Sequence, residues 1–275
     1  MSQSGAFCKS EEKLGVMMEK KIQILVAAHK KVSMPSQAMY TPIQVGAALS
    51  AKRFDGFIQD NTGREISSKN PYFNELTALY WARYNSDADI IGLVHYRRFF
   101  SFSKQKDSDK ILDESAIRAL LSKKSVIVPK KRRYWIESSE SHYRHAHHGV
   151  ALDVLRKVIA IKQPDYLTAY DHNMSRTWAH MFNMFIMPRT EYDAYVDWLF
   201  EILFAVEQKI QSDVVNWDIY EKRVYGFLSE RLLDVWLEKN HISYTEVPVV
   251  FMEKQNWLLK GGKFLARKIG FGRQI

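Results

Sequence analysis

The chain has 275 residues, of which 46% are hydrophobic, and it carries 40 Lys and Arg against 31 Asp and Glu. A hydrophobic fraction of this size builds a substantial core and excludes disorder as the dominant state. The single cysteine, Cys8, excludes an internal disulfide and a metal site built from several cysteines. No stretch approaches the ~20 consecutive apolar residues of a membrane helix, and the N-terminus lacks a secretory signal pattern, so we expect a cytoplasmic protein.

The net charge of +9 is concentrated in two basic runs that contain no acidic residue. Residues 115–136 carry seven Lys and Arg, and residues 260–275 carry five. The rest of the chain is mildly acidic. Two basic patches on such a body predict a polyanionic partner, which is a nucleic acid, an anionic membrane or a phosphorylated substrate.

Hydrophobic patterns predict strands and helices that alternate along the chain after a polar leader at residues 1–20. The predicted strands cover residues 22–28, 89–96, 125–128, 182–187 and 247–252. The predicted helices cover residues 72–84, part of 104–125, 142–162, 191–210 and 220–240. This alternation predicts an α/β fold with a mostly parallel sheet and a helical C-terminal half.

We expect a single domain over residues 21–255, with a donor-binding half at about 21–130 and an acceptor-binding half at about 131–255. Residues 256–275 form a basic amphipathic tail in which Trp, Leu, Ile and Phe alternate with five cations. We expect such a tail to lie on an anionic membrane surface, and the alternative is packing on its own domain.

Two predicted strands end in polar residues that suit a diphosphate. His29 and Lys30 follow the first strand. The strand at 89–96 closes in four such residues, His95, Tyr96, Arg97 and Arg98. Ligands of open α/β sheets bind beyond the carboxyl ends of the strands, and arginine forks match phosphate oxygens, so we assign all six residues to a donor site. The alternative for residues 95–98 is a solvated strand end with an ion pair.

Further polar residues are assigned to the same donor site or to the acceptor. Lys69 and Asn70, in a loop before the helix at 72–84, are expected to contact the donor. Asn183 lies in an apolar strand pattern and is either a bulge or a ligand contact. The His-rich stretch at 142–148 permits a zinc site but lacks a typical zinc motif, so we assign His147 and His148 to acceptor binding.

Glu230 is the carboxylate that we expect to act as general base. It flanks the apolar face of the helix at 220–240, where partial desolvation favours proton acceptance. The alternative is a structural pair with Arg231, which we also assign to acceptor binding. Asp153 is the next candidate for the catalytic carboxylate. Asp87 and Asp89 precede their strand and so fall at its amino end, away from the expected site, and we therefore expect no metal cofactor.

Several stretches together resemble a known family. They include residues 60–85 (DNTGREISSKNPYFNELTALYWARYN), HYRR at 95–98, NMFIM at 183–187 and GFLSER at 226–231. The chain is similar over residues 21–240 to the bacterial glycosyltransferases of capsular and exopolysaccharide biosynthesis, long catalogued as a domain of unknown function. Some members are associated with galactofuranosyl transfer.

This resemblance implies a GT-A-like fold with a nucleotide-binding core, a nucleotide-diphosphate sugar donor such as a UDP-sugar, and a growing, lipid-linked glycan acceptor. It implies that residues 95–98 occupy the strand end where other GT-A enzymes carry a metal-binding Asp-x-Asp. It also places Asn183 in the family's NMF strand and Glu230 where inverting enzymes often carry their base. The expected location is peripheral, at the inner face of the cell membrane.

A non-enzymatic nucleic-acid-binding protein is the alternative from a different class. Residues 129–135 (PKKRRYW) combine cations with aromatic rings, which suits a phosphate backbone. This alternative does not explain the polar residues at the strand ends, so we expect no nucleic-acid partner.

Overall fold

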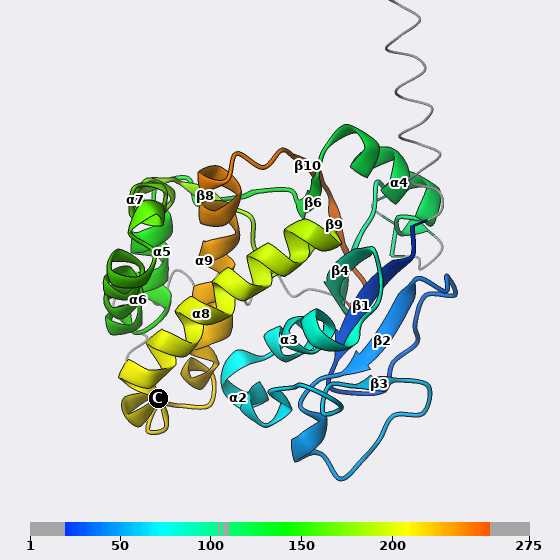
Figure 1. Cartoon of the computed structure of the whole chain (residues 1–275), viewed down its shortest axis with the longest axis horizontal. Helices are drawn as coiled ribbons and strands as arrows, with labels where there is room; N and C mark the ends of the chain where they lie inside the picture. The colour runs from blue at the N-terminus through cyan, green and yellow to red at the C-terminus, as the bar shows by residue number, and fades with distance from the viewer. Residues whose placement is uncertain (1–19, 104, 107–109, 254–275) are drawn as a thin grey trace, which may run out of the picture.

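The computed structural model describes residues 20–103, 105–106 and 110–253. The expected leader at 1–20 therefore lies outside the described residues except for Lys20. The basic tail at 256–275 lies entirely outside them, so its role at a membrane stays a prediction. Figure 1 shows the described part of the chain as a sheet with helices packed against it.

The described residues form a nine-stranded sheet and a separate two-stranded ribbon. The strands are β1 (Ile22–Ala28), β2 (Tyr40–Gln44), β3 (Ile58–Gln59), β4 (Ile90–His95), β5 (Arg98–Phe100), β6 (Val126–Pro129), β7 (Arg132–Arg133), β8 (Trp178–Ala179), β9 (Phe185–Pro188), β10 (Tyr244–Val247) and β11 (Val249–Phe251). The main order is β10-β6-β9-β4-β1-β2-β3, with β5 beside β4 and β11 beside β5, and the ribbon pairs β7 with β8. Pairs β1–β2, β1–β4, β2–β3 and β6–β10 are parallel, which confirms the predicted α/β fold with a mostly parallel sheet.

The helices fill the connections and the C-terminal half of the chain. They are α2 (Asn70–Phe73), α3 (Leu76–Asn85), α4 (Glu114–Lys123), α5 (Ser139–Ala146), α6 (Gly149–Lys162), α7 (Leu167–Ser175), α8 (Arg189–Val214) and α9 (Val224–Lys239). Short 3-10 turns lie at Ala47–Leu49, Ser67–Lys69, Pro164–Tyr166 and Glu221–Arg223. Local signals set the helix starts: Asp113 accepts a hydrogen bond from the N–H of Ala116, and Ser138 forms a capping box with Ser141.

Both faces of the sheet are covered, which explains why β1 is apolar at every position except Gln23. Leu25 and Ala27 of β1 join the core under the helical layer, whereas Ile24 and Val26 join a second core that includes Ile117 of α4. In Figure 1 the long helix α8 starts at the sheet beside β9, runs away from it and crosses in front of α9, and α5, α6 and α7 form a group on the far side of α9 from the sheet. The C-terminal half is helical as predicted, but β9, β10 and β11 return to the sheet that the first half builds.

The structure corrects four sequence-based boundaries. The helix expected at 72–84 breaks at Asn74, whose φ is 51°, and the helix expected at 142–162 is interrupted at residues 147–148. The strand expected at 182–187 begins only at Phe185, and it runs antiparallel to β4 and β6. The segment 247–252 divides into two strands, β10 and β11. Strands β2, β3 and β5 were not predicted, because each is short and only partly apolar.

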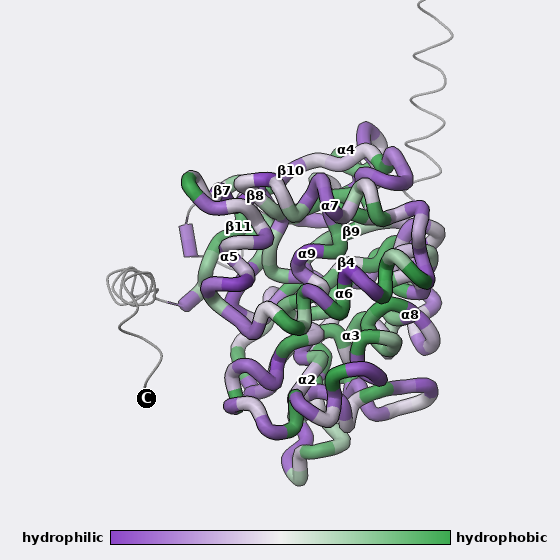
Figure 2. The backbone as a smooth tube through the Cα atoms, turned by 90° about the vertical axis from the view of Figure 1, so that its left-hand side faces the viewer, coloured by the Kyte–Doolittle hydropathy of each residue, from purple (hydrophilic) through white to green (hydrophobic). Residues whose placement is uncertain are grey.

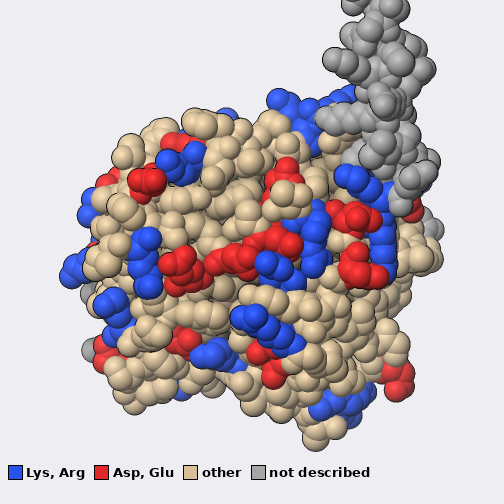
Figure 3. Space-filling model, in the orientation of Figure 1, with Lys and Arg blue, Asp and Glu red and all other residues tan. Residues whose placement is uncertain are grey.

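The face that carries α8 shows both signs of charge interspersed, as Figure 3 shows. Arg83 of α3 lies 2.8 Å from Asp197, and Arg189 lies 3.0 Å from Asp193, both of α8. This face therefore presents no single-sign field to a polyanion. None of the helices within the described ranges is both long and apolar enough to cross a membrane.

Candidate active site

The carboxyl ends of β1 and β4 meet at one edge of the sheet. The two strands are parallel neighbours, with Ala27 opposite His95. The segment after His95 forms a tight hairpin, because His95 pairs with Arg98 of β5 across a turn made by Tyr96 and Arg97. The sequence-based expectation that the polar residues of the two strand ends converge is therefore met in the geometry.

An outer cluster of cations surrounds the ring of Tyr96. The ring of His29 lies edge-on at 5.3 Å, Nζ of Lys30 lies 5.3 Å from the ring centre, and Cζ of Arg97 lies 4.8 Å from it. The carboxylate of Glu253 bridges the two cations, 3.1 Å from Lys30 Nζ and 2.8 Å from Arg97 Nε. The edge of the sheet thus already holds one anion between Lys30 and Arg97.

The electrostatics of the outer cluster favour a neutral His29. Burial, followed by the charges of Arg97 and Lys30, lowers the pKa of His29 below its ordinary value of 6.5. The same cations hold the pKa of Glu253 below its usual range, with the hydrogen bond from Lys30 as the main cause. This edge is therefore electropositive and selects for negative charge.

An inner cluster lies behind the hairpin and joins residues from five segments. Its members are Glu75, His95, Arg98, Asn183 and Glu230. The amide of Asn183 donates to Glu75 Oε1 at 2.8 Å, and His95 Nε2 lies 3.9 Å from the same oxygen. The cluster combines two carboxylates, a cation and two neutral polar groups within a mostly enclosed space.

The turn at Phe182 and Asn183 is strained and is held by the inner cluster. Both residues have left-handed backbones, with φ of 83° and 51°, which is uncommon for a bulky residue such as Phe. The N–H of Phe182 donates to Glu230 Oε1 at 3.1 Å, and its carbonyl lies 2.6 Å from His95 Nε2. Because a carbonyl only accepts, His95 carries its proton on Nε2. Strain of this kind, fixed by side chains, is typical of functional sites.

His95 is neutral in this setting. Burial lowers its pKa, and the nearby carboxylate of Glu75 only partly opposes that shift. Burial likewise lowers the pKa of the Arg98 guanidinium from its ordinary value, against the opposing charges of Glu230 and Glu75. The guanidinium lies over the ring of Phe182, 4.5 Å from its centre, so it is oriented by packing as well as by charge.

Two buried polar atoms of the inner cluster have no hydrogen-bond partner among the described residues. They are Arg98 Nε, a donor, and Asn183 Oδ1, an acceptor. Buried polar groups are otherwise almost always paired, since an unpaired one costs about 1–3 kcal/mol. A free donor and a free acceptor at the ends of the central strands are what a bound polar ligand would satisfy.

The start of α9 is fastened to the inner cluster through Asn74. The left-handed Asn74 accepts from Arg223 Nε at 2.9 Å, and the carbonyl of Gly226 accepts from Asn183 at 3.1 Å. A Cβ on Gly226 would lie 2.7 Å from Asn74 Nδ2, so a larger residue at this position would force the Asn74 side chain to shift. Arg223 thereby adds a further cation that acts on both His29 and Arg98.

Three of the predicted site residues are placed in other surroundings. Lys69 Nζ lies 2.5 Å from Glu207 of α8, and Asn70 donates to the carbonyl of Asn74 at 2.8 Å, so Asn70 supports the break between α2 and α3. Asp153 is half-exposed on α6, where Arg144 lies 2.6 Å away. The structure gives these residues local partners and does not bring them into either cluster.

Of the remaining predicted residues, one contacts the inner cluster and two stack on aromatic rings. Arg231 is buried, with Nη1 3.4 Å from Glu230 Oε2, so the alternative of a Glu–Arg pair is present together with the Phe182 contact. His147 stacks on Phe227 at 4.1 Å, and its Nδ1 lies 3.2 Å from Glu221. His148 stacks on Trp217 at 4.3 Å.

Glu75, Arg223 and Glu253 belong to the site but were not predicted. Glu75 falls inside the helix predicted at 72–84, because the apolar pattern continues across the break at Asn74. Arg223 and Glu253 are brought to the strand ends by long-range contacts, which no local pattern reveals. The Asn-Glu pair in the middle of a helical pattern was the one available signal for the break, since Asn tolerates the left-handed conformation.

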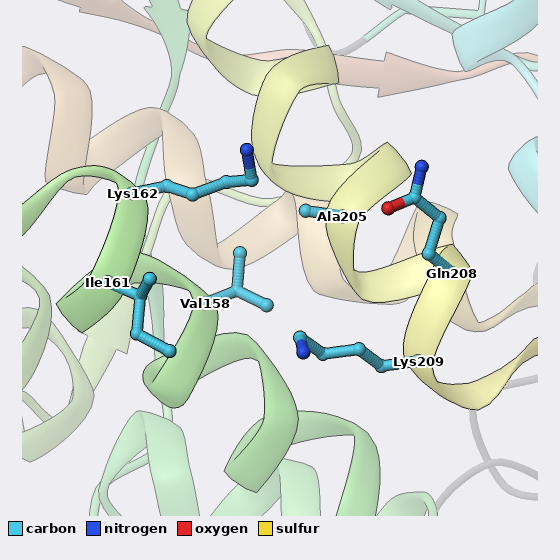
Figure 4. Close-up of a pocket in the computed structure, with 6 residues that line it drawn as sticks. All are labelled: Val158, Ile161, Lys162, Ala205, Gln208 and Lys209. Carbon is cyan, nitrogen blue, oxygen red and sulfur yellow. The ribbon is translucent and has the colours of Figure 1, made fainter.

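A groove elsewhere on the surface is separate from this chemistry. It lies between α6 and α8 and is lined by Val158, Ile161, Lys162, Ala205, Gln208 and Lys209, as Figure 4 shows. Its lining has two lysines and an amide but no carboxylate, His or Arg. The polar clusters at the strand ends, rather than this groove, carry the candidate site.

The Asp-x-Asp at residues 87–89 lies at the amino end of β4, as predicted. Asp87 lies 2.5 Å from Lys21 Nζ, and Asp89 accepts from the N–H of Lys21 at 2.8 Å. His145 and His148 have different partners, Glu137 and Trp217. Across the described ranges, no group of three or more His, Cys, Asp or Glu side chains is placed to hold a metal ion. Donor binding without a metal stays a prediction.

Comparisons with known proteins agree with the fold. The chain is similar to a solved structure, the apo form of the bifunctional glycosyltransferase WbbM, with 28% identity and a TM-score of 0.79. The match covers 85% of this chain and 46% of that one, so the chain spans about half the length of that protein. The expected GT-A-like fold is confirmed. No curated protein matches. Residues 23–241 match the family model described as a domain of unknown function, DUF4422, and the chain belongs to that family.

Proposed function

We propose that this protein is a glycosyltransferase that moves a sugar from a nucleotide-diphosphate donor to a hydroxyl of a growing glycan. The observation that carries the proposal is the pair of unpartnered buried atoms, Arg98 Nε and Asn183 Oδ1, at the carboxyl ends of β1 and β4. A phosphate oxygen satisfies the first, and a sugar hydroxyl satisfies the second. The similarity to a glycosyltransferase structure supports the same class of reaction.

The donor diphosphate would bind across the outer cluster. Lys30 and Arg97 are each roughly half-exposed and already hold the carboxylate of Glu253 between them, so the site selects an anion of that size. Arg98 supplies a planar fork from the buried side. His29 is neutral and can donate or accept a hydrogen bond without adding charge. A UDP-sugar is the donor that we propose, on the resemblance to the polysaccharide-synthesising family.

The transfer would be a single displacement with inversion at the anomeric carbon. An acceptor hydroxyl gives its proton to Glu230, its oxygen forms the new bond to the anomeric carbon, and the bond to the nucleotide diphosphate breaks. Glu230 Oε1 accepts a hydrogen bond from the N–H of Phe182, and this bond holds the carboxylate in position. Its side chain is 18% exposed, so the carboxylate is accessible to an acceptor hydroxyl.

Negative charge on the leaving diphosphate would be stabilised by the cations of the site. Lys30, Arg97, Arg98 and Arg223 all act on the same edge of the sheet. Preorganised cations at the position where charge develops lower the barrier without reorganisation. We therefore propose transfer without a divalent metal.

The acceptor would approach over an aromatic wall next to the inner cluster. His147 stacks on Phe227, the ring of Tyr220 packs against Phe227 at a tilt of 43°, and Arg223 lies 5.4 Å from the ring of Phe227. Sugar rings pack their apolar faces on aromatic side chains, and the polar groups of Asn183 and Arg231 border this wall. Galactofuranose as the sugar and a lipid-linked surface polysaccharide at the inner membrane face as the acceptor are proposed on the family resemblance.

A thermal-shift screen tests this function directly. The folded protein is heated with nucleoside diphosphates and nucleotide sugars, UDP-galactofuranose among them, in EDTA and in Mn²⁺. Since a ligand that binds only the folded state raises the midpoint, we expect stabilisation by at least one nucleotide sugar in EDTA. Stabilisation only in Mn²⁺ would contradict the metal-free mechanism, and no stabilisation by any nucleotide would contradict the function.

A further inference from the structure

The segment that contains β7 and the turn after it combines exposed apolar side chains with exposed cations. We define the basic turn as residues 130–136. Trp135 and Ile136, at its tip, are 81% and 79% exposed, and Trp135 has a left-handed backbone with φ of 63°. Exposure of two adjacent large apolar side chains to water is unfavourable, and monomeric soluble proteins usually avoid it. We therefore expect a partner to cover this tip.

The basic turn is anchored by Tyr134 and not by the residues at its tip. Tyr134 is buried, donates its hydroxyl to Met181 Sδ at 3.0 Å and stacks on His142 at 4.3 Å. Its backbone N–H donates to the carbonyl of Thr177 at 2.7 Å. Tyr134 is buried, whereas the next two residues, Trp135 and Ile136, are exposed. The tip therefore points into solvent from an anchored base.

The charges around the tip are positive. Lys130, Arg132 and Arg133 are exposed, and within the described ranges none of them forms an ion pair. Lys131 is engaged by Glu246 at 3.2 Å. The nearest acid in sequence, Glu137, is 6% exposed and lies within 3.0 Å of His142, so it adds little negative charge to this surface. The basic turn therefore presents two apolar side chains beside three cations that form no ion pair with the described residues.

We propose that the basic turn docks on an anionic lipid bilayer, with Trp135 and Ile136 in the interface and the three cations at the headgroups. An apolar tip beside cations matches a bilayer, whose hydrocarbon begins just below a layer of negative charge. A nucleic acid would satisfy the cations and could stack on Trp135, but it offers nothing to the aliphatic chain of Ile136. The side chains therefore favour lipid over nucleic acid.

The basic turn is physically linked to the candidate site. Met181, which contacts Tyr134, directly precedes the strained Phe182 and also lies 3.5 Å from Arg231 Nη1. In Figure 2 the ribbon of β7 and β8 lies at the same edge of the molecule as β11, where a hydrophobic turn projects. Docking here would hold the site near a membrane-bound acceptor, a consequence that rests on the proposed function, whereas the docking itself does not.

Site-specific fluorescence tests the docking on the full chain. Cys8→Ser removes the single cysteine, and Ile136→Cys then accepts an environment-sensitive NBD label. A matched label at Ile161→Cys, on α6 and 74% exposed, is the control. Vesicles contain either 30% phosphatidylglycerol in phosphatidylcholine or phosphatidylcholine alone. We expect a blue shift and a rise in emission at position 136 only, with the anionic vesicles only, and no response to soluble glycerol phosphate.

A second experiment removes the three cations of the basic turn and measures the effect on vesicle binding. Replacing Lys130, Arg132 and Arg133 by Gln should weaken partitioning to the anionic vesicles by roughly 100-fold, at roughly fivefold per cation. The melting temperature, measured in parallel, confirms that the variant is folded. An absent response at position 136, an equal response at position 161, or a larger response to duplex DNA or RNA than to vesicles would overturn the proposal. None of these readouts depends on sugar transfer, so this proposal and the proposed function fail separately.

Discussion

The carboxylate of Glu230 accepts a hydrogen bond from the backbone N–H of Phe182 at 3.1 Å, and the carbonyl of that same residue lies 2.6 Å from His95 Nε2. One strained residue is thus held between the proposed base on α9 and the end of β4. Asn183, next in the chain, turns its amide to Glu75 and to the carbonyl of Gly226. Helix α9 and the central sheet are joined through a turn of two left-handed residues.

Glu230→Gln should lower turnover by roughly 10²–10⁴-fold, the usual weight of acid–base catalysis, while donor affinity changes little. The glutamine oxygen can still accept from Phe182, so the turn should keep its geometry. Initial rates with a nucleotide sugar and a soluble acceptor measure the effect. Asp171→Asn, which removes a surface partner of Arg156, is the matched control and should leave the rate near normal.

Glu75 is the other carboxylate of the inner cluster that could act as general base, so the result for Glu230→Gln must be compared with that for Glu75→Gln. It accepts from Asn183 and lies 3.9 Å from His95, so Glu75→Gln should perturb the turn as well as the charge. A normal rate for Glu230→Gln beside a rate near zero for Glu75→Gln would transfer the role of base to Glu75.

Glu253→Gln should raise the affinity for a nucleoside diphosphate. The carboxylate now lies between Lys30 and Arg97, where it competes with the phosphates for the same cations. Removing its charge should strengthen binding several-fold, since exposed ion pairs are worth about 0–1 kcal/mol each. Calorimetric titration with UDP measures the change. Weaker binding by the variant would show that Glu253 organises the cations instead of competing for them.

Binding of a diphosphate should be accompanied by proton uptake at His29. In the free protein, burial and the charges of Arg97 and Lys30 lower the pKa of His29 below 6.5, so it is neutral near pH 7. An anion that neutralises those cations raises this pKa, so affinity should increase as the pH falls from 7 toward 6. Titrations in buffers of different ionisation enthalpy count the protons. His29→Gln should abolish the uptake, and an unchanged uptake would assign it elsewhere.

Gly226→Ala should destabilise the fold by about 1–3 kcal/mol and lower turnover. The added Cβ would lie 2.7 Å from Asn74 Nδ2, and relief of that clash moves the residue that holds Arg223. Thermal unfolding measures the loss. Gly149→Ala is the control, because its Cβ would meet only the side chain of Arg144, which is 38% exposed. Equal melting temperatures for both variants would show that the Asn74 contact is not needed.

The strand ends could be predicted because the rule that locates them is local. A buried run followed by polar residues marks each carboxyl end, and parallel neighbours bring His29 beside Tyr96. The break at Asn74 could not be predicted in this way. Its left-handed backbone is stabilised by Arg223, 149 residues further along the chain, while the apolar pattern of a helix continues across it.

The turn at Phe182 was concealed for a related reason. The segment FNMFIM is apolar enough to read as strand throughout, yet two of its residues adopt a conformation that hydrophobicity does not encode. Their partners, His95 and Glu230, come from β4 and α9. Glu75 also belongs to the site through tertiary contacts, with Asn183 and His95. The helical pattern of residues 72–84 gives no sign of these contacts, so this carboxylate could not be predicted.

The most direct test of the central claim is calorimetric titration of UDP into the wild-type protein and into Arg98→Lys, both in EDTA. The variant keeps the positive charge but loses the buried Nε donor and the planar fork. We expect the wild type to bind without metal, and the variant to bind roughly 10–100-fold more weakly at an unchanged melting temperature. Equal affinities for the two proteins, or no binding of UDP by a folded wild type, would contradict a diphosphate site at the ends of β1 and β4.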